Sequence, residues 1–173
     1  MKSPPLLPDE TLHRVLRVAN FDGISVMAVA GMLALASASV RDFSGAAIGL
    51  LVAAAGAIEL HGAGLLKAGE RRGMNWLIAS QPYLAAIILL YCAVRLANFD
   101  LSLLREAMTA DLRKSLEETG YQEERFLRTV YMLTYGALAF GTLAYQGWMT
   151  LFYYRRREAV AAAVDPLDQL TDI

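Results

Sequence analysis

The stretch from Ala53 to Lys67 places a carboxylate and an imidazole inside a run of otherwise small and apolar residues. The carboxylate belongs to Glu59 and the imidazole to His61. An acid at the centre of a bilayer costs roughly 2.5–3.5 kcal/mol on insertion scales, so acids within membrane-spanning helices are rare and face the protein interior. Such a group can relay a proton, bind a cation, or hold helices together through hydrogen bonds. Glu59 is therefore the first candidate functional residue.

Other polar side chains are expected at the depth of Glu59. Counted inward from the ends of their predicted helices at a rise of 1.5 Å per residue, Glu59, Gln81 and Tyr145 all lie about 12–15 Å deep. The hypothesis is a proton or cation relay, and the alternative is a set of hydrogen bonds that only joins helices. The candidate relay residues are Glu59, His61, Gln81, Tyr145, Gln146 and, nearer the surface of the first span, Asp22.

The sequence predicts no metal site, no cofactor and no catalytic residues. Glu59 and His61 are two residues apart, about 200° around a helix, whereas ligands converge at a spacing of three or four residues. His13, the other histidine, lies near the predicted membrane surface, so a haem lacks a second buried axial ligand. No Ser-His-Asp arrangement, phosphate-binding loop or catalytic carboxylate pair is present. An enzyme is therefore the least favoured class.

The composition indicates a membrane protein. The chain of 173 residues is 56% hydrophobic and 19% charged, with a mean hydropathy of +0.38. Its apolar residues form four blocks, each near the roughly 20 residues that a helix needs to cross a bilayer. The net charge of -1 and the lack of a basic patch exclude nucleic acid as an expected partner. Cys92 is the only cysteine, which rules out an intrachain disulfide.

These blocks predict an all-α integral membrane four-helix bundle over residues 21–154. A Pro-rich tail and an amphipathic surface helix are expected over 1–20, and a cytoplasmic tail over 155–173. Ala36-Ser37-Ala38 resembles a signal-peptidase site, but the preceding region is long, Pro-bearing and partly acidic for a leader, so we expect the first span to be retained. The four predicted spans are about 21–40, 43–66, 74–96 and 126–154.

Residues 98–125 form the only sizeable predicted segment outside the bilayer. Leucine and methionine recur there at helical spacing among seven acidic residues, and Gly120 breaks the pattern. We expect an extra amphipathic helix between the third and fourth spans, which binds lipid, a partner or the end of the bundle. The alternative is a solvated linker helix.

Small residues and tyrosines predict the faces along which the spans pack. Gly45, Gly49 and Gly56 share one seam with Glu59, so a neighbouring backbone can approach closely. A second stripe of small residues lies on the same helix, which predicts that one of the two faces is available for another copy of the chain. In the last span, the stripe expected to face the bundle is Tyr131, Tyr135, Leu138, Thr142, Tyr145, Met149 and Phe152.

The basic residues predict that both termini are cytoplasmic. Nine of the sixteen lie in the N-terminal segment, the loop at 67–73 and the run 155–157, against one in the first loop. This places 98–125 on the extracytoplasmic side of a plasma or bacterial inner membrane. The aromatic belt expected on the cytoplasmic side consists of Trp76, Trp148, Tyr153 and Tyr154.

The sequence supports two classes of function. The first is a small transporter or channel that moves protons or another cation past Glu59. The second is an accessory or scaffold membrane protein that transports nothing and binds a membrane-protein partner or lipid through its amphipathic segment. The expected partners are the lipid bilayer, another copy of the chain and a membrane protein, but no nucleic acid.

Overall fold

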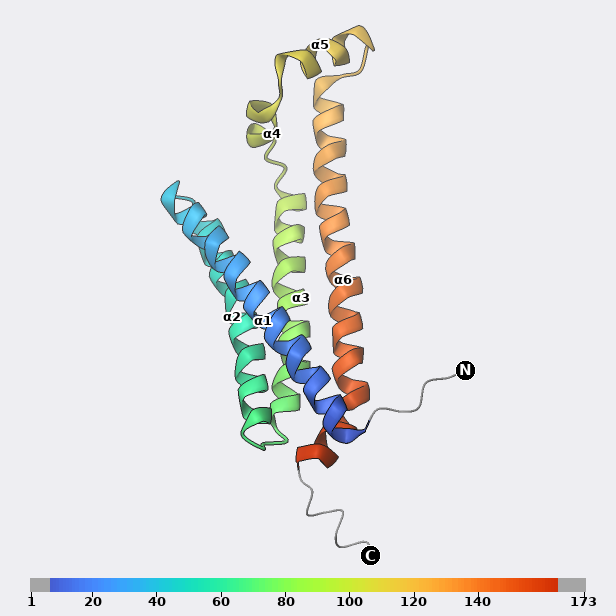
Figure 1. The fold of residues 1–173 in the computed structure, drawn as a ribbon. Helices are drawn as coiled ribbons and strands as arrows, with labels where there is room; N and C mark the ends of the chain where they lie inside the picture. Colours follow the sequence, from blue (N-terminus) through green and yellow to red (C-terminus); the bar gives the residue numbers. More distant parts are fainter. Residues whose placement is uncertain (1–6, 165–173) are drawn as a thin grey trace, which may run out of the picture. The chain divides into compact units, whose positions relative to one another are not determined.

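The computed structural model describes residues 7–164, apart from the side chain of Leu103. Helices make up 88% of the described residues, and no strand occurs among them. The all-α prediction is thus confirmed (Figure 1). In chain order the helices are α1 (Pro8–Ser39), α2 (Phe43–Lys67), α3 (Gly73–Ala97), α4 (Ser102–Ala107), α5 (Ala110–Glu118) and α6 (Glu123–Val164).

Three of these helices, α1, α2 and α3, are long and apolar enough to cross a membrane. They contain 32, 25 and 25 residues, against the roughly 20 that a span requires. The 42-residue helix α6 does not reach the same apolarity, because tyrosines, threonines and glutamine interrupt its apolar run. The prediction of four spans is therefore supported for the first three only, and the fourth stays a prediction.

Helix α1 runs without a break through the predicted surface helix and first span. It begins at Pro8, a residue suited to a first helical position because it has no N–H to leave unpaired. The residues that it buries are Thr11, Val15, Ala19, Asp22, Gly23, Ala30 and Ala34. Their spacing of three, four and seven carries one buried face along the helix. The first six residues of the predicted tail lie outside the described residues.

A short connection joins α1 to α2, as the sequence predicted. Arg41 adopts a φ of 61°, the left-handed conformation that reverses a chain in few residues. Asp42 then caps α2, because its carboxylate accepts hydrogen bonds from the Gly45 N–H at 3.0 Å and the Ser44 hydroxyl at 2.6 Å.

Two of the three predicted packing glycines lie where α1 and α2 pack side by side (Figure 1). A Cβ added at Gly49 would lie 2.8 Å from the Cβ of Ala34. One added at Gly56 would lie 2.6 Å from the carbonyl oxygen of Gly23. Gly45 instead lies against Asp42 and Ser37 at the turn. Gly49 and Gly56 thus permit close helix contact, whereas Gly45 belongs to the connection.

The segment between α3 and α6 contains two short helices where one amphipathic helix was predicted. α4 ends at Ala107, and Thr109 starts α5 by accepting a hydrogen bond from the Leu112 N–H at 3.3 Å. Threonine is a favoured N-cap residue, which explains the break. After α5, Gly120 adopts a φ of 67°, so the break predicted there is present.

Helix α6 continues past the predicted end of the last span at residue 154 and ends at Val164. The basic run 155–157 is helical, and Val160 is fully buried. The first part of the predicted C-terminal tail is therefore an ordered helix, and residues 165–173 lie outside the described residues.

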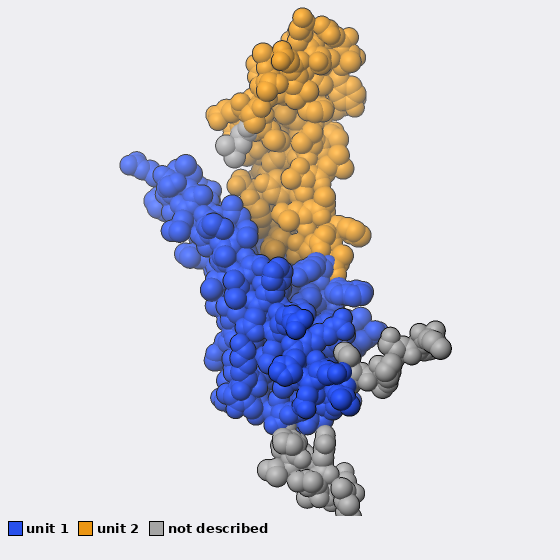
Figure 2. All heavy atoms as spheres, in the orientation of Figure 1, with its two compact units in different colours: residues 1–87, 145–173 blue, residues 88–144 orange. Residues whose placement is uncertain are grey.

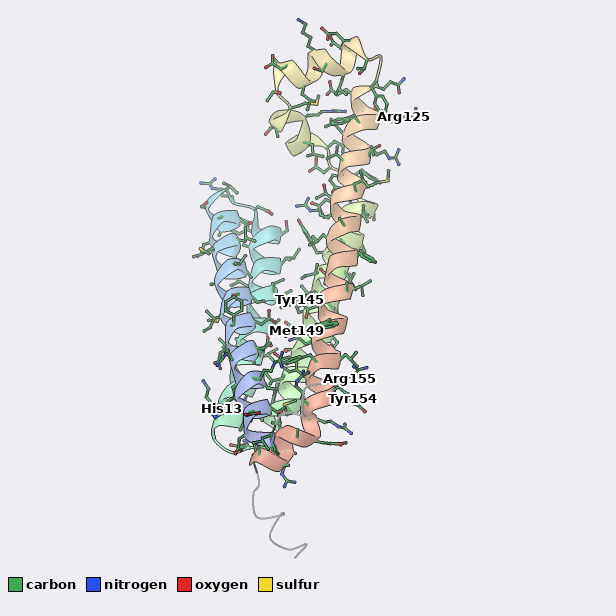
Figure 3. All side chains as sticks on the ribbon, turned by 45° about the vertical axis from the view of Figure 1, so that its right-hand side comes forward. His13, Arg125, Tyr145, Met149, Tyr154 and Arg155 are labelled. Carbon is green, nitrogen blue, oxygen red and sulfur yellow. The ribbon has the colours of Figure 1, made fainter. Side chains whose placement is uncertain are left out.

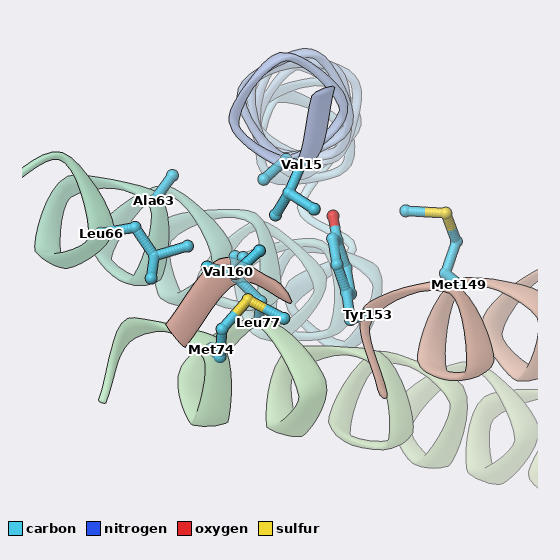
Figure 4. Close-up of a cluster of buried hydrophobic side chains, with 9 residues drawn as sticks. Val15, Ala63, Leu66, Met74, Leu77, Met149, Tyr153 and Val160 are labelled. Carbon is cyan, nitrogen blue, oxygen red and sulfur yellow. The ribbon is translucent and has the colours of Figure 1, made fainter. Parts of the chain in front are cut away.

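The chain divides into two compact units (Figure 2). Unit 1 comprises residues 1–87 and 145–173, and unit 2 comprises residues 88–144. Within unit 1, buried side chains of α1, α2, α3 and the last part of α6 form one hydrophobic cluster (Figure 4). Its members are Val15, Ala19, Ala63, Leu66, Met74, Leu77, Met149, Tyr153 and Val160.

Candidate functional site

A set of polar side chains, which we call the polar cluster and of which all but the half-exposed Tyr145 are buried, lies next to this hydrophobic cluster in unit 1. It contains two carboxyl groups, an amide and three hydroxyls, contributed by four helices. The members are Asp22 of α1, Glu59 of α2, Ser80 and Gln81 of α3, and Tyr145 and Tyr153 of α6. The structure therefore brings together four of the six residues predicted as a relay.

Glu59 is the centre of the polar cluster and is only 2% exposed. Its Oε1 atom accepts a hydrogen bond of 2.5 Å from the Tyr153 hydroxyl and one of 3.2 Å from the Gln81 Nε2 atom. Hydrogen bonds to an ionised group are among the stronger ones in proteins. Glu59 and Gln81, which were expected at one depth, are thus hydrogen-bonded, and the second donor to Glu59 is Tyr153.

Asp22 forms the second acidic centre. The Tyr145 hydroxyl donates a hydrogen bond of 2.7 Å to the Asp22 Oδ1 atom. The Asp22 carboxyl is close enough to Glu59 for the two acids to interact electrostatically. Asp22 was expected nearer the membrane surface than Glu59, and this difference in depth stays a prediction.

Close helix packing explains why a side chain as short as aspartate reaches Glu59. Gly23 follows Asp22 directly, and a Cβ added there would lie 3.0 Å from the carbonyl oxygen of Gly56, three residues before Glu59. On the other side of α2, a Cβ added at Gly62 would lie 2.9 Å from the carbonyl oxygen of Gly73, where α3 begins. Because neither contact tolerates a larger residue, α1 and α3 both approach α2 at the level of Glu59.

The polar cluster has more acceptors than donors. Gln81 Nε2 donates to Glu59 and to the Ser80 hydroxyl at 3.2 Å, and that hydroxyl donates to the Leu77 carbonyl at 2.9 Å. Both tyrosine hydroxyls donate to carboxylates. Of the described side chains, Asp22 Oδ2 and Gln81 Oε1 of the cluster are nevertheless buried without a hydrogen-bond partner, as is Gln146 Oε1 outside the cluster.

This excess of acceptors defines the chemistry that the polar cluster can perform. Two adjacent carboxyls in a dry interior cannot both stay ionised unless a positive charge joins them, so one proton or one small cation completes the pair. Hard monovalent and divalent cations prefer oxygen ligands, and carboxylate, amide and phenol oxygens are available here. One added positive charge would therefore balance the two carboxyls.

Gln146 and His61 complete the predicted set without joining the polar cluster. Gln146 is buried on α6 beside Tyr145, with its Oε1 atom unpartnered. His61 is exposed and lies edge-on to the Trp76 ring, with 5.4 Å between ring centroids. Within the described part of the chain, no group of three or more His, Cys, Asp or Glu side chains is arranged to hold a metal ion.

Tyr153 is the member that sequence reasoning missed. It was predicted to belong to an aromatic belt, and Trp76, Trp148 and Tyr154 are indeed exposed. Tyr153 is fully buried, and its ring points away from α6 into the hydrophobic cluster (Figure 4), so its placement in the belt was wrong. The predicted stripe on α6 ran through Tyr145, which is 49% exposed (Figure 3). The buried positions of this stretch are 142, 146, 149 and 153.

The signal that identifies Tyr153 is present in the sequence. Thr142, Gln146 and Met149 already follow a spacing of four and three, and the next step of four reaches Tyr153. The predicted stripe stepped by three from Thr142 to Tyr145 and from Met149 to Phe152, where the buried positions step by four. It therefore passed onto the neighbouring face of α6.

Comparison with known proteins gives no further guide to this site. The chain matches no protein-family model, and searches of the curated proteins and of the solved structures give no significant match.

Proposed function

We propose that this protein is a four-span integral membrane protein that moves protons or small monovalent cations past Glu59. The observation that carries the proposal is the burial of two carboxyls, Asp22 and Glu59, in one polar cluster that still contains unpartnered acceptor oxygens. A structural hydrogen-bond network satisfies its members, whereas an ion-binding one has acceptors to spare. Paired intramembrane acids also mark proton and ion pathways in other membrane proteins.

Helix α6 serves as the fourth span in this proposal. A stretch of 29 residues, such as 126–154, is about 43 Å long at 1.5 Å per residue, which exceeds a hydrocarbon core of about 30 Å. The polar residues that lower its apolarity include Thr142, Gln146 and Tyr153, all of which are buried. Their polar atoms therefore need not face lipid. With four spans, the basic residues favour both termini in the cytoplasm and 98–125 outside.

Transport requires the paired acids to alternate between two charge states. When the pair gains a proton or cation, its net charge falls to that of a single carboxylate, which the donors from Tyr145 and Tyr153 stabilise. Loss of that charge leaves two adjacent carboxylates, a state favoured only while water reaches them. Uptake and release are thereby coupled to opening of the cluster.

A flux assay in liposomes tests the proposal. Purified protein is reconstituted with a pH-sensitive dye inside the vesicles, or with a sodium-sensitive dye in a parallel arm, and a potassium diffusion potential drives cation entry. We expect flux above that of empty liposomes for the native chain and flux at the empty-liposome level for Glu59→Gln. Glu70→Gln is the matched control, because this acid pairs with Arg72 in a loop of unit 1 and takes no part in the polar cluster.

A scaffold function is the second candidate, favoured by one observation. Hydrogen bonds from α3 and α6 meet at a single oxygen of Glu59, so this residue also fixes three helices relative to one another. Native protein that gives only the flux of empty liposomes in both arms contradicts transport by the isolated chain. The scaffold function, with another copy of the chain or a membrane-protein partner, then takes its place.

A further inference from the structure

A second polar region lies in unit 2, around the end of α3. A cavity of about 190 Å³ is lined there by Arg95, Asp100, Leu104, Tyr131, Thr134 and Tyr135. This volume is smaller than the roughly 300–1,000 Å³ of sites for drug-sized ligands. The cavity therefore suits a chemical group of few heavy atoms.

Arg95 supplies the positive charge of this cavity. Its Nε atom donates a hydrogen bond of 3.3 Å to the Tyr91 hydroxyl, and its backbone carbonyl accepts one of 3.1 Å from the Tyr131 hydroxyl. These two contacts fix the residue at both ends. Among the described residues, no ion pair involves Arg95. The remaining N–H groups of its guanidinium are arranged in the fork that binds carboxylate or phosphate oxygens.

Asp100 supplies the negative charge. Its Oδ1 atom accepts hydrogen bonds from the Ser102 hydroxyl at 2.6 Å and from the Ser102 N–H at 3.0 Å. These hydrogen bonds hold the pKa of Asp100 below its ordinary value, so the group is anionic at neutral pH. The opposite charges of Arg95 and Asp100 give the cavity lining no net charge, and neither side chain forms an ion pair with another described residue.

The rings of Tyr131 and Tyr135 form part of the remaining wall, together with Leu104 and Thr134. Tyr131 and Tyr135 have ring centroids 4.7 Å apart, and Tyr91 lies edge-on to Tyr135 at 5.8 Å. Aromatic faces next to a carboxylate are a known setting for organic ammonium groups, because the negative face of each ring attracts the cation.

We propose that this cavity binds a small zwitterion, with its oxyanion on Arg95 and its ammonium between Asp100 and the tyrosine rings. An anion without an ammonium would face Asp100 unpaired, and a cation without an oxyanion would face Arg95 unpaired. Phosphoethanolamine has the required chemistry, as the headgroup of phosphatidylethanolamine or in soluble glycerophosphoethanolamine. This proposal does not depend on transport past Glu59.

Lipid retention measured by native mass spectrometry tests the proposal. Full-length protein in mild detergent is equilibrated with equal amounts of phosphatidylethanolamine and phosphatidylglycerol of the same chain length. We expect preferential retention of phosphatidylethanolamine, reduced about tenfold by Arg95→Gln, because a charge-assisted hydrogen bond is lost. Asp100→Asn is expected to remove the preference for phosphatidylethanolamine while leaving retention of phosphatidylglycerol unchanged or higher.

Arg125→Gln is the matched control, because Arg125 is an exposed arginine of α6 in unit 2 that does not line the cavity (Figure 3). An Arg95→Gln protein with native helix content and unchanged retention of phosphatidylethanolamine overturns the proposal, and so does equal retention of both lipids by the native chain. Asp100→Asn gives a separate test at an exposed position if Arg95→Gln fails to fold. Calorimetric titration with soluble glycerophosphoethanolamine identifies the source of the zwitterion. Binding of the soluble compound indicates a site for a free zwitterion. If only the lipid binds, the site recognises a lipid headgroup.

Discussion

Helix α6 provides tyrosines to both units, and these tyrosines do opposite things. In unit 1 the hydroxyls of Tyr145 and Tyr153 donate to the carboxylates of Asp22 and Glu59. In unit 2 the Tyr131 hydroxyl donates to a backbone carbonyl, and the rings of Tyr131 and Tyr135 lie at a cavity that contains Arg95. A phenol can stabilise an anion through its O–H or a cation through its ring. In unit 2 the ring that lies over the Arg95 guanidinium is that of Tyr91 on α3, with 5.4 Å to the ring centroid.

Close backbone contacts at glycines are found around the polar cluster. Backbones of unit 1 approach one another at Gly23, Gly56, Gly62 and Gly73, near the buried Asp22 and Glu59. A Cβ added at Gly64 of unit 1, or at Gly136 or Gly141 of unit 2, would meet nothing within 4 Å. These close contacts therefore lie near the buried acids and are not a property of unit 1 as a whole.

The largest expected effect on stability comes from removing the charged residue at the centre of each region, Glu59 in unit 1 and Arg95 in unit 2. Glu59→Ala leaves the Tyr153 hydroxyl and the Gln81 amide without their acceptor and opens a void, so we expect the free energy of unfolding to fall by about 3–5 kcal/mol. Arg95→Ala removes a half-buried side chain, and a loss of about 1 kcal/mol is expected. Unfolding in mixed detergent, followed by circular dichroism, gives both values. Equal losses would show that the two centres are equally buried in solution.

A second comparison tests the packing contrast with one change in each unit. Gly56→Ala places a methyl group 2.6 Å from the Gly23 carbonyl oxygen, and overpacking of this kind lowers stability by about 1–3 kcal/mol. Gly141→Ala meets no neighbour within 4 Å, so the better helix propensity of alanine raises stability by roughly 0.5–1 kcal/mol. The same unfolding assay measures both. A stabilising Gly56→Ala would contradict the close approach of α1 and α2.

A third pair removes one hydroxyl from each region. Tyr153→Phe takes a donor from a buried carboxylate, and we expect a loss of about 1–3 kcal/mol in stability. Tyr131→Phe takes a donor from the Arg95 carbonyl, an oxygen with a second lone pair, and a loss of about 0.5–1 kcal/mol is expected. Glu59→Gln/Tyr153→Phe, compared with its single variants, separates the hydrogen bond from the packing of the ring. Additive losses would show that the two side chains do not interact.

Sequence reasoning identified the members of the polar cluster better than their pairing. Long apolar blocks fix α1, α2 and α3, and helical rise alone places Glu59 and Gln81 at one depth. Depth does not give rotation about a helix axis, so Tyr145 was predicted near Glu59 but donates to Asp22. An error of one residue along α6 turns a side chain by about 100°, which is why Tyr153 was assigned to a belt.

The region around Arg95 was not predicted, for a different reason. Isolated basic residues near the ends of spanning helices ordinarily extend towards the membrane surface, so Arg95 did not stand out as a candidate. The residues around it, Tyr91, Asp100 and Tyr131, are spread over 41 positions of the sequence numbering, 91 to 131, and follow no single periodicity. A cavity arises from what neighbouring elements leave unfilled, and patterns along one helix do not report this.

The smallest expected effect concerns the ionisation of Asp100, an exposed acid that lines the cavity of unit 2. Its hydrogen bonds to Ser102 favour the carboxylate, so its pKa lies below the ordinary value of about 3.9. A pKa that is lower in the folded state contributes stability above the unfolded pKa, and this contribution is lost as the pH falls through the folded pKa. The start of α4 should therefore loosen only in acid below about pH 4.

Ser102→Ala removes the hydroxyl donor and should move the pKa of Asp100 back up, as a carboxyl-carbon NMR titration of labelled protein can measure. Ser115→Ala, on α5, is the control and should leave that titration unchanged. If Ser102→Ala also leaves it unchanged, the hydroxyl does not hold the carboxylate, and the negative wall of the proposed zwitterion site is less fixed than Arg95 opposite it.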